Sequence, residues 1–292
     1  VPVIRSMKEG LVANKIERIH GIFNGTSNYI LSSMDKEKTS FKDTLIKAMK
    51  LGYAESNPKS DLNGDDVASK VKILSSLGFN SFINSNIHVE GIKNIDNEDI
   101  SNAKKLGYKL KLLGFSEIKN NKIYQRVHPT LVKKESYIAG VDGVLNAVII
   151  DGKPIGKNII QGEGAGPSAT TSALVSDVSS ILRGNVKFPF AISSLKRKKF
   201  SNGKISDLFF SSYIRLKVKD KYGVLSDVTK TFSNNKVSIK RVLQSPYKLK
   251  KNSSIIIITH SSKDAHIQKT LKTLAKRSYI IERPKLLRIE NG

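Results

Sequence analysis

The order of secondary-structure elements predicted beyond residue 210 most restricts the fold of this 292-residue chain. Apolar residues in strict alternation indicate β-strands, and apolar residues three or four apart indicate helices. The order is strand, helix, strand, strand, helix, strand, at Tyr213–Val218, Val224–Phe232, Val237–Gln244, Ser254–His260, Ala265–Ala275 and Ser278–Arg288. This βαββαβ order is ferredoxin-like, so we predict a small α+β domain over residues 210–292.

A basic segment separates this domain from the rest of the chain. Residues 193–209 contain the run Lys196-Arg197-Lys198-Lys199 among Ser, Gly and Asn residues. Such a charge run is typical of a solvated linker. Because 292 residues leave room for about two domains, residues 1–192 are expected to form the first.

The first domain mixes strands and helices without an internal repeat. Ser40 is a suitable N-cap and Gly52 a suitable stop for a helix over Phe41–Leu51. The polar loop Tyr53–Gly64 leads into a helix over Asp65–Leu77. We also expect strands at Lys15–Phe23, Lys122–Val132, Leu145–Ile150 and Asn158–Gln161, a capping turn at Asn24–Asn28, and helices at Ser101–Leu113 and from Gly166 to about Leu182.

The formal net charge of +25 raises the alternative of nucleic-acid binding. Only 10 of the 50 basic residues are Arg, and Lys is the less suitable side chain for bidentate recognition of bases or phosphates. No aromatic residues are interleaved with the basic ones. A solvated, Lys-rich surface therefore explains the charge better than a nucleic-acid partner does.

Several classes of protein and site are excluded by composition. The chain has no Cys, which excludes disulfides, thiolate metal sites and a Cys nucleophile, and which fits a cytoplasmic protein. Its longest all-aliphatic run, Ile255–Ile258, is far shorter than the roughly 20 residues that span a bilayer, so no membrane partner is expected. The five His residues lack ligand spacing, so no metal site is predicted.

A charged pair lies within the apolar face of the helix predicted over Asp65–Leu77. On a helical wheel, Asp66 and Lys70 are only about 40° apart and fall among Val67, Val71 and Leu74. A carboxylate beside an ammonium keeps both groups ionised, and a lysine so held can donate a proton to a carbonyl oxygen. The alternative is an ordinary i,i+4 ion pair at the edge of a packed face.

Further carboxylates precede this helix. Glu55, Asp61 and Asp65 are crowded into the same region, which would suit a substrate carrying an ammonium group. Asp65 is explained equally well by the helix macrodipole, but Glu55 is not. The carboxylates therefore favour a functional role for the Asp66–Lys70 pair.

The glycines Gly162, Gly164 and Gly166 precede the helix that ends near Leu182. Glycines at a helix N-terminus allow backbone amides to approach an anion. The alternative is a turn that needs positive φ angles. The spacing differs from the dinucleotide-binding GxGxxG fingerprint, so alone it is a weak indication of a cofactor site.

Together these segments resemble the homoserine dehydrogenase family. The matching segments, in order, are Gly21–Ile30 (GIFNGTSNYI), Leu51–Glu55 (LGYAE), Asp61–Lys70 (DLNGDDVASK), and Gly162–Gly166 (GEGAG) with Thr170. Residues 1–192 resemble its catalytic domain, which implies a mainly open sheet covered by helices on one face. Residues 210–292 resemble an ACT domain, a ligand-sensing module, and Asp220–Leu225 matches its usual turn with Tyr222 where Pro is common.

The resemblance implies reduction of L-aspartate 4-semialdehyde to L-homoserine by NADPH or NADH, in threonine, methionine and isoleucine biosynthesis. Lys70 matches the proton donor of the family, and Asp66 matches the acid beside it. The remaining matches are Glu55 and Asp61 for the substrate ammonium, Tyr53, Gly25 and Thr26 for the substrate turn and loop, and Gly162, Gly164 and Gly166 for the segment beside the cofactor.

The family also has features that would lie before Val1. These are the Rossmann domain, a second active-site lysine and most of a sodium site. The chain alone is therefore expected to bind NAD(P)H poorly and to expose apolar residues of the helix after Gly166. A homodimer formed through the catalytic sheet is also implied. The alternative function is an amino-acid-sensing ACT protein without its own dehydrogenase activity.

Overall fold

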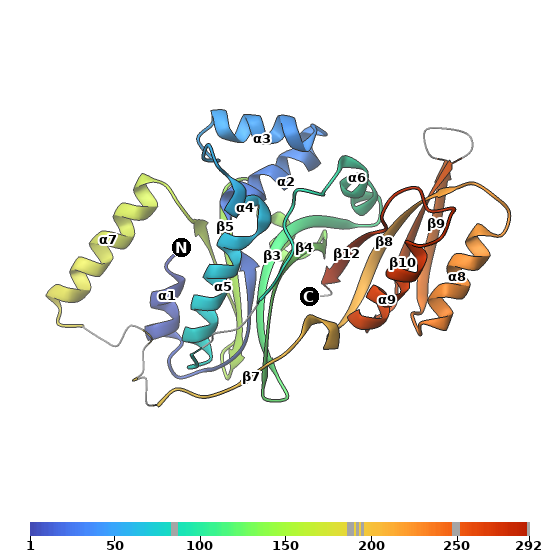
Figure 1. Cartoon of the computed structure of the whole chain (residues 1–292). Helices are drawn as coiled ribbons and strands as arrows, with labels where there is room; N and C mark the ends of the chain where they lie inside the picture. The colour runs from blue at the N-terminus through green and yellow to red at the C-terminus, as the bar shows by residue number, and fades with distance from the viewer. Residues whose placement is uncertain (83–86, 186–189, 191–192, 194–195, 247–251, 291–292) are drawn as a thin grey trace. The chain divides into compact units, whose positions relative to one another are not determined.

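The computed structural model describes residues 1–292 except 83–86, 186–189, 191–192, 194–195, 247–251 and 291–292 (Figure 1). The described residues form two compact units. Unit 1 comprises residues 1–129 and 134–203, and unit 2 comprises residues 130–133 and 204–292. The division between residues 203 and 204 falls inside the segment 193–209 that was predicted to be a linker.

The sheet of unit 1 carries five main strands. Their spatial order is β6 (Gly156–Glu163), β5 (Leu145–Lys153), β1 (Lys15–Ile22), β3 (Tyr108–Lys119) and β4 (Lys122–Lys133), the last four residues of which cluster with unit 2. Strand β1 is antiparallel to both β3 and β5, and β5 is antiparallel to β6. The short strands β2 (His88–Val89) and β7 (Ser201–Asn202) pair in parallel with β4.

Unit 1 also contains seven α-helices among its described residues. They are α1 (Val3–Arg5), α2 (Gly25–Glu37), α3 (Phe41–Lys50), α4 (Lys59–Asn63), α5 (Asp65–Gly78), α6 (Asn97–Lys105) and α7 (Pro167–Leu182). Of these, α2, α5 and α6 pack on the sheet. Helix α5 packs on β1 and β3, and α2 packs on β3 and β5 (Figure 1). The predicted open sheet with covering helices is therefore confirmed.

Helix α5 begins immediately after Gly64, whose φ of 89° ends α4 and turns the chain. Val67, Val71 and Leu74 recur every three or four residues and are buried. Asp66 and Lys70 are only partly exposed, with 28% and 43% of their side chains accessible. The apolar spacing thus holds the charged pair at the rim of the packed face.

Two expected elements of unit 1 differ from the structure. The helix predicted at Ser101–Leu113 is wrong, because α6 ends at Lys105 and residues from Tyr108 onward form β3. Gly107 has a φ of 82° and breaks the helix between them. The segment Tyr53–Gly64, expected to be a loop, contains the short helix α4.

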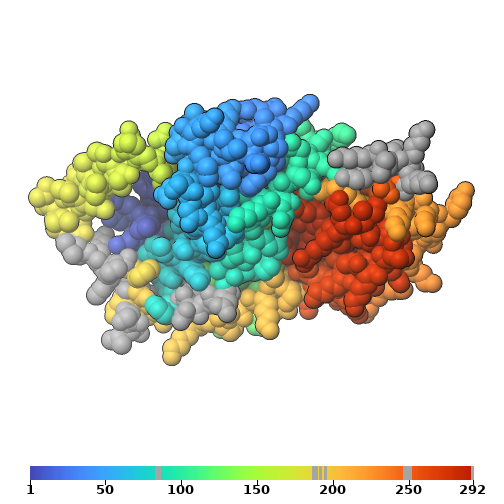
Figure 2. Space-filling model, turned by 45° about the horizontal axis from the view of Figure 1, so that its top comes forward, coloured from blue at the N-terminus to red at the C-terminus, as the bar shows by residue number. Residues whose placement is uncertain are grey.

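Helix α7 contributes no buried residue (Figure 2). Leu174, Val178 and Leu182 are 61%, 54% and 82% exposed. Arg5 attaches its middle to the rest of unit 1, through hydrogen bonds of 3.0 Å to the Ser176 carbonyl and the Asp177 carboxylate. The expected exposure of apolar residues after Gly166 is therefore observed.

Unit 2 has the βαββαβ order that the sequence predicts. Strands β8 (Phe209–Lys219), β9 (Ile239–Pro246), β10 (Asn252–Thr259) and β12 (Lys285–Glu290) lie in the order β12–β8–β10–β9, with antiparallel pairing. Helices α8 (Val224–Asn234) and α9 (Asp264–Leu274) pack on them around a core that includes Ile214, Phe232 and Ile257.

The last strand is shorter than the predicted Ser278–Arg288. Ile280 forms only a single bridge to Val218, and regular pairing starts at Lys285. Pro284 precedes it and has no N–H to offer a neighbouring strand. The small strand β11 (Ser262–Lys263), which also pairs with β8, was not predicted.

Candidate active site

The turn between β1 and α2 builds one wall of the site. Asn24 is the N-cap of α2, and its Oδ1 accepts a hydrogen bond of 2.8 Å from the Ser27 amide. A Cβ added to Gly25 would lie 2.7 Å from the Val144 carbonyl oxygen, so only glycine allows this close approach. The Thr26 hydroxyl donates a hydrogen bond to the Tyr53 carbonyl and ties the turn to the loop after α3.

The Asp66–Lys70 pair faces this turn from α5. Lys70 Nζ lies 2.7 Å from Asp66 Oδ2 and donates a second hydrogen bond of 2.9 Å to the Phe23 carbonyl. An isolated surface i,i+4 pair would lack this second acceptor from another element. The ammonium is therefore fixed at the end of β1 rather than left mobile on the helix surface.

Asp61 joins the same cluster through Asn24. Asn24 Nδ2 donates to Asp61 Oδ1 at 2.8 Å and to Asp66 Oδ2 at 2.9 Å. The structure thus brings Asp61, Asp66 and Lys70 together, all three being residues selected from the sequence. Asn24 was predicted only to form the turn and to cap α2.

Tyr53 and Glu55 lie in the loop beside this cluster. The ring of Tyr53 packs against that of Tyr29, with 4.9 Å between centroids. Glu55 is exposed and has no hydrogen-bond or ion-pair partner among the described residues. Its carboxylate is therefore available to a ligand, but no direct contact joins it to Asp61 or Lys70.

A pocket of about 180 Å³ opens beside the Lys70 ammonium. Its walls are mostly apolar, and the only polar side chains that line it are those of Lys70 and Asn146. The other residues lining it are Val1, Val3, Ile4, Ile22, Phe23, Ile73, Leu74, Val148 and Gly164. An apolar pocket with a few convergent polar groups is the usual form of a small-molecule site.

Of the three predicted glycines, Gly164 alone lines this pocket. Gly162 lies in β6, and Gly166 is the N-cap of α7 with a φ of 108°. A Cβ at Gly164 would lie 1.9 Å from Asn146 Nδ2, so glycine is needed where this segment crosses the Asn146 amide. Two signals far apart in the sequence, Lys70 and the glycine segment, therefore meet at one pocket.

The residues of the pocket fit a nicotinamide ring. Asn146 is 8% exposed, and its Oδ1 is buried without a hydrogen-bond partner. An unsatisfied amide in an apolar pocket suits a flat, uncharged ring that bears its own amide. The pocket fits the nicotinamide end of the cofactor.

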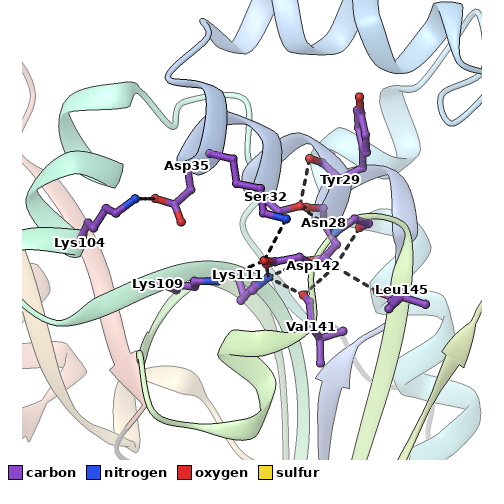
Figure 3. Close-up of polar contacts among 12 residues, drawn as sticks. Asn28, Tyr29, Ser32, Asp35, Lys104, Lys109, Lys111, Val141, Asp142 and Leu145 are labelled. Atoms are coloured by element: carbon purple, nitrogen blue, oxygen red, sulfur yellow. Dashed lines mark hydrogen bonds and ion pairs between the residues drawn. The ribbon is translucent and has the colours of Figure 1, made fainter.

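A buried polar network supports the turn from the other side (Figure 3). The Asn28 side-chain amide donates to the carbonyls of Val141, Gly143 and Leu145 at 3.0–3.1 Å. These residues surround Val144, whose carbonyl contacts Gly25. Asn28 thereby holds the loop 141–145 against the first turn of α2.

Lys111 lies at the centre of this network, with only 1% of its side chain exposed. Its Nζ donates to Asn28 Oδ1 at 3.1 Å, to Asp142 Oδ1 at 2.8 Å and to the Val141 carbonyl (Figure 3). The prediction missed Lys111 because it placed this residue in a helix over Ser101–Leu113, whereas it lies in β3. The signal present in the sequence was the alternation from Tyr108 onward.

The charges of this network shift its pKa values. Burial lowers the pKa of Lys111 below its ordinary 10.5, and the Asp142 carboxylate opposes this only in part. Burial alone would raise the pKa of Asp142, but its hydrogen bond and ion pair with Lys111, together with Lys109, hold it below 3.8. Asp142 is thus the counter-ion on which the buried lysine depends.

Unit 2 contains a separate pocket of about 380 Å³ at the turn between β8 and α8. Lys221, Gly223 and Asp227 line it, together with Lys219, Tyr222, Val224, Ser278 and Tyr279. The Tyr279 hydroxyl donates to Asp227 Oδ2 at 2.7 Å, and Arg277 pairs with the same carboxylate. Burial, and then the Asp227 hydrogen bond, raise the pKa of Tyr279.

The described ranges show neither a metal-binding cluster nor a membrane-spanning helix. There, no group of three or more His, Asp or Glu side chains is arranged to hold a metal ion. Within the same ranges, no helix is long and apolar enough to cross a membrane.

Comparison with known proteins supports these assignments. The family model of homoserine dehydrogenase matches residues 2–179, and that of the ACT domain matches residues 212–278. The homoserine dehydrogenase of Helicobacter pylori is 37% identical over 292 residues, which are 100% of this chain and 69% of that protein.

Solved structures give the same result. A homoserine dehydrogenase from Thiobacillus denitrificans superposes with a TM-score of 0.92 at 34% identity, covering 99% of this chain and 68% of that one. A hyperthermophilic archaeal homoserine dehydrogenase mutant in complex with NADPH has a TM-score of 0.53 at 26% identity, covering 64% and 53% of the two chains.

The pocket with its paired lysine and the separate βαββαβ unit define an oxidoreductase catalytic domain joined to an ACT domain. The chain belongs to the homoserine dehydrogenase family, which uses NAD(P). The family, fold class and enzyme class expected from the sequence are therefore confirmed. These matches favour the dehydrogenase over the alternative of an ACT sensor without dehydrogenase activity.

Proposed function

We propose that unit 1 carries the substrate site for reduction of L-aspartate 4-semialdehyde to L-homoserine, with Lys70 as the proton donor. In this reaction the aldehyde carbon gains a hydride and the carbonyl oxygen gains a proton. The observation that carries the proposal is the Lys70 ammonium, held by Asp66 at 2.7 Å and Phe23 at 2.9 Å, at the edge of an apolar pocket.

The substrate would lie between this pocket and the loop after α3. Asp61 and Glu55 would bind its ammonium group, because one Asp61 oxygen and the whole Glu55 carboxylate lack partners among the described residues. Gly25, Thr26 and Tyr53 would form the adjoining wall. Lys70 would face the aldehyde oxygen and transfer its proton there as charge develops.

A nicotinamide cofactor, NADP or NAD, supplies the hydride when bound. The segment Gly162–Gly166 would run beside it, with Gly164 in the pocket wall. Asn146 would hydrogen-bond the carboxamide, and the apolar side chains of the pocket would exclude water from the reacting carbon. We also propose that the enzyme requires sodium. It would form a homodimer through the catalytic sheet and act in the cytoplasm.

Homoserine binding tests this assignment without requiring turnover. By isothermal titration, Asp61→Asn and Glu55→Gln should each weaken homoserine binding by about 10-fold or more, since each removes one charge from the ammonium site. Asp65→Asn is the matched control, because Asp65 begins α5 in the same region of the chain and has no proposed ligand. Equal affinities in all four proteins would contradict the proposed function.

We also propose that the ACT unit binds an amino-acid effector at the β8–α8 turn. Lys221 would attract the effector carboxylate into the pocket. L-Threonine at 100 times its dissociation constant should then stabilise the full chain by about 2.7 kcal/mol. Calorimetry should show this stabilisation reduced in Lys221→Ala and kept in Lys230→Ala, whose lysine lies outside the pocket. No shift with any of threonine, methionine or isoleucine would refute the effector site.

A further inference from the structure

We propose that Asn24 is a positioning residue that joins the ammonium-binding carboxylate of Asp61 to the proton-donating pair Asp66–Lys70. The inference rests on the function proposed above. It concerns a residue whose sequence context indicates only a turn and a helix cap. Its support comes from the three hydrogen bonds of one buried amide group.

The orientation of the Asn24 amide is fixed by its partners. The residue is 6% exposed, and its Oδ1 accepts from the Ser27 amide at 2.8 Å. Its Nδ2 faces two carboxylate oxygens, which can only accept. The opposite amide orientation would set an acceptor against both carboxylates. Nδ2 therefore donates one hydrogen to Asp61 and the other to Asp66.

This arrangement solves an electrostatic problem. Asp61 and Asp66 both lie within hydrogen-bond distance of one nitrogen, and two carboxylates so close would otherwise repel each other. The Asp66 oxygen that binds Asn24 is also the one that binds Lys70, at 2.7 Å. Asn24 therefore fixes the carboxylate that orients the ammonium, while Phe23, its neighbour in the chain, accepts from the ammonium directly.

The consequence is a fixed spacing between two parts of the substrate. The Asp61 oxygen that lacks a partner among the described residues would hold the substrate ammonium, and Lys70 would face the aldehyde oxygen. These two groups lie at opposite ends of a short amino acid. Because a single side-chain amide separates their protein partners, Asn24 would set the alignment of substrate with proton donor.

Two substitutions separate this role from helix capping. Asn24→Ser keeps an N-cap acceptor but loses the amide that bridges the carboxylates. Ser40→Ala is the control, because it removes the N-cap of α3, where Ser40 accepts from the Asp43 amide. We expect Asn24→Ser to remain folded although it loses the two hydrogen bonds to the carboxylates. Its kcat/KM should fall about 100-fold and its homoserine affinity should weaken, whereas Ser40→Ala should keep both.

Asn24→Asp provides a readout that does not depend on activity. The charged groups facing the new carboxylate are Asp61 from α4 and Asp66 and Lys70 from α5. Raising the pH ionises the introduced aspartate, whose unperturbed pKa is about 3.9, and its carboxylate then repels the two that it faces. The Tm deficit of Asn24→Asp relative to the unsubstituted protein should therefore grow with pH, and by more than that of Asn24→Ser, which loses the bridge but adds no carboxylate.

The outcomes distinguish this inference from the proposed function. Normal kcat/KM and homoserine affinity in Asn24→Ser, or a pH-independent Tm deficit in Asn24→Asp, would overturn the bridging role. If the unsubstituted protein fails to bind homoserine, the proposed function fails instead. In that case the pH-dependent Tm deficit still decides whether Asn24 bridges the two carboxylates.

Discussion

Lys70→Ala should lower kcat of the dehydrogenase by about 10²–10⁴-fold while changing KM for aspartate semialdehyde much less. That range is the usual contribution of a positioned general acid. The alanine leaves the Asp61 and Glu55 carboxylates in place, so the proposed ammonium site remains. What is lost is the proton needed as the aldehyde oxygen becomes negative. Steady-state kinetics at saturating NADPH would measure both parameters.

Two further variants identify the cause of that loss. Lys70→Arg keeps a positive charge beside Asp66, but a guanidinium does not give up its proton near neutral pH. It should therefore fold normally, bind homoserine and still lose most of its turnover. Lys72→Ala removes a lysine from the same helix outside the pocket and should keep normal kcat. Near-normal turnover in Lys70→Ala would rule out Lys70 as the proton donor.

The sequence could predict the Asp66–Lys70 pair because helix periodicity is local. A spacing of four residues places both side chains on one face whatever the rest of the chain does. The Asn24 amide bridges Asp61 and Asp66, which lie 37 and 42 positions further along the chain. Its Oδ1 already has a local role as the N-cap acceptor. Nothing in a local pattern shows that the other end of the same amide meets two carboxylates from α4 and α5.

The β3 strand shows why part of the fold could not be predicted from the sequence. Lys109 and Lys111 fall in the segment that was predicted to be a helix, and lysines in a buried strand are costly unless paired. Their partner Asp142 lies 33 and 31 residues further along the chain, beyond the reach of any periodicity. The two helices of unit 2 were predicted correctly because their apolar faces and turns are both local.

Asp142→Asn should destabilise unit 1 by about 3–5 kcal/mol at neutral pH. The Lys111 ammonium is 1% exposed, and Asp142 is its only carboxylate partner among the described residues. Removing one member of a buried ion pair leaves an uncompensated charge, which usually costs this much. Hydrogen exchange of the β3 amides would report the change in unit 1 without a contribution from unit 2.

The partners of Asp142 allow a graded comparison. Lys111→Met should cost less than Asp142→Asn, because Asp142 keeps Lys109 at 3.2 Å and Lys36 at 3.6 Å. Lys36→Ala is the exposed control, since its side chain is 66% exposed and such pairs contribute about 0–1 kcal/mol. If Lys111→Met is as harmful as Asp142→Asn, the asymmetry inferred for this pair is wrong.

The lowered pKa of Asp142 also determines how the stability difference between Asp142→Asn and the unsubstituted protein depends on pH. The native pKa of Asp142 lies below its ordinary value of 3.8, chiefly because Lys111 outweighs the effect of burial. A carboxyl group with a depressed native pKa stabilises the fold above its unfolded pKa, and the stabilisation is lost as pH falls through the native value. The difference in stability between Asp142→Asn and the unsubstituted protein should therefore be full at neutral pH and shrink below about pH 3.8.

Because Asn28 joins this network to the loop that contacts Gly25, Asp142→Asn should also lower kcat/KM at neutral pH.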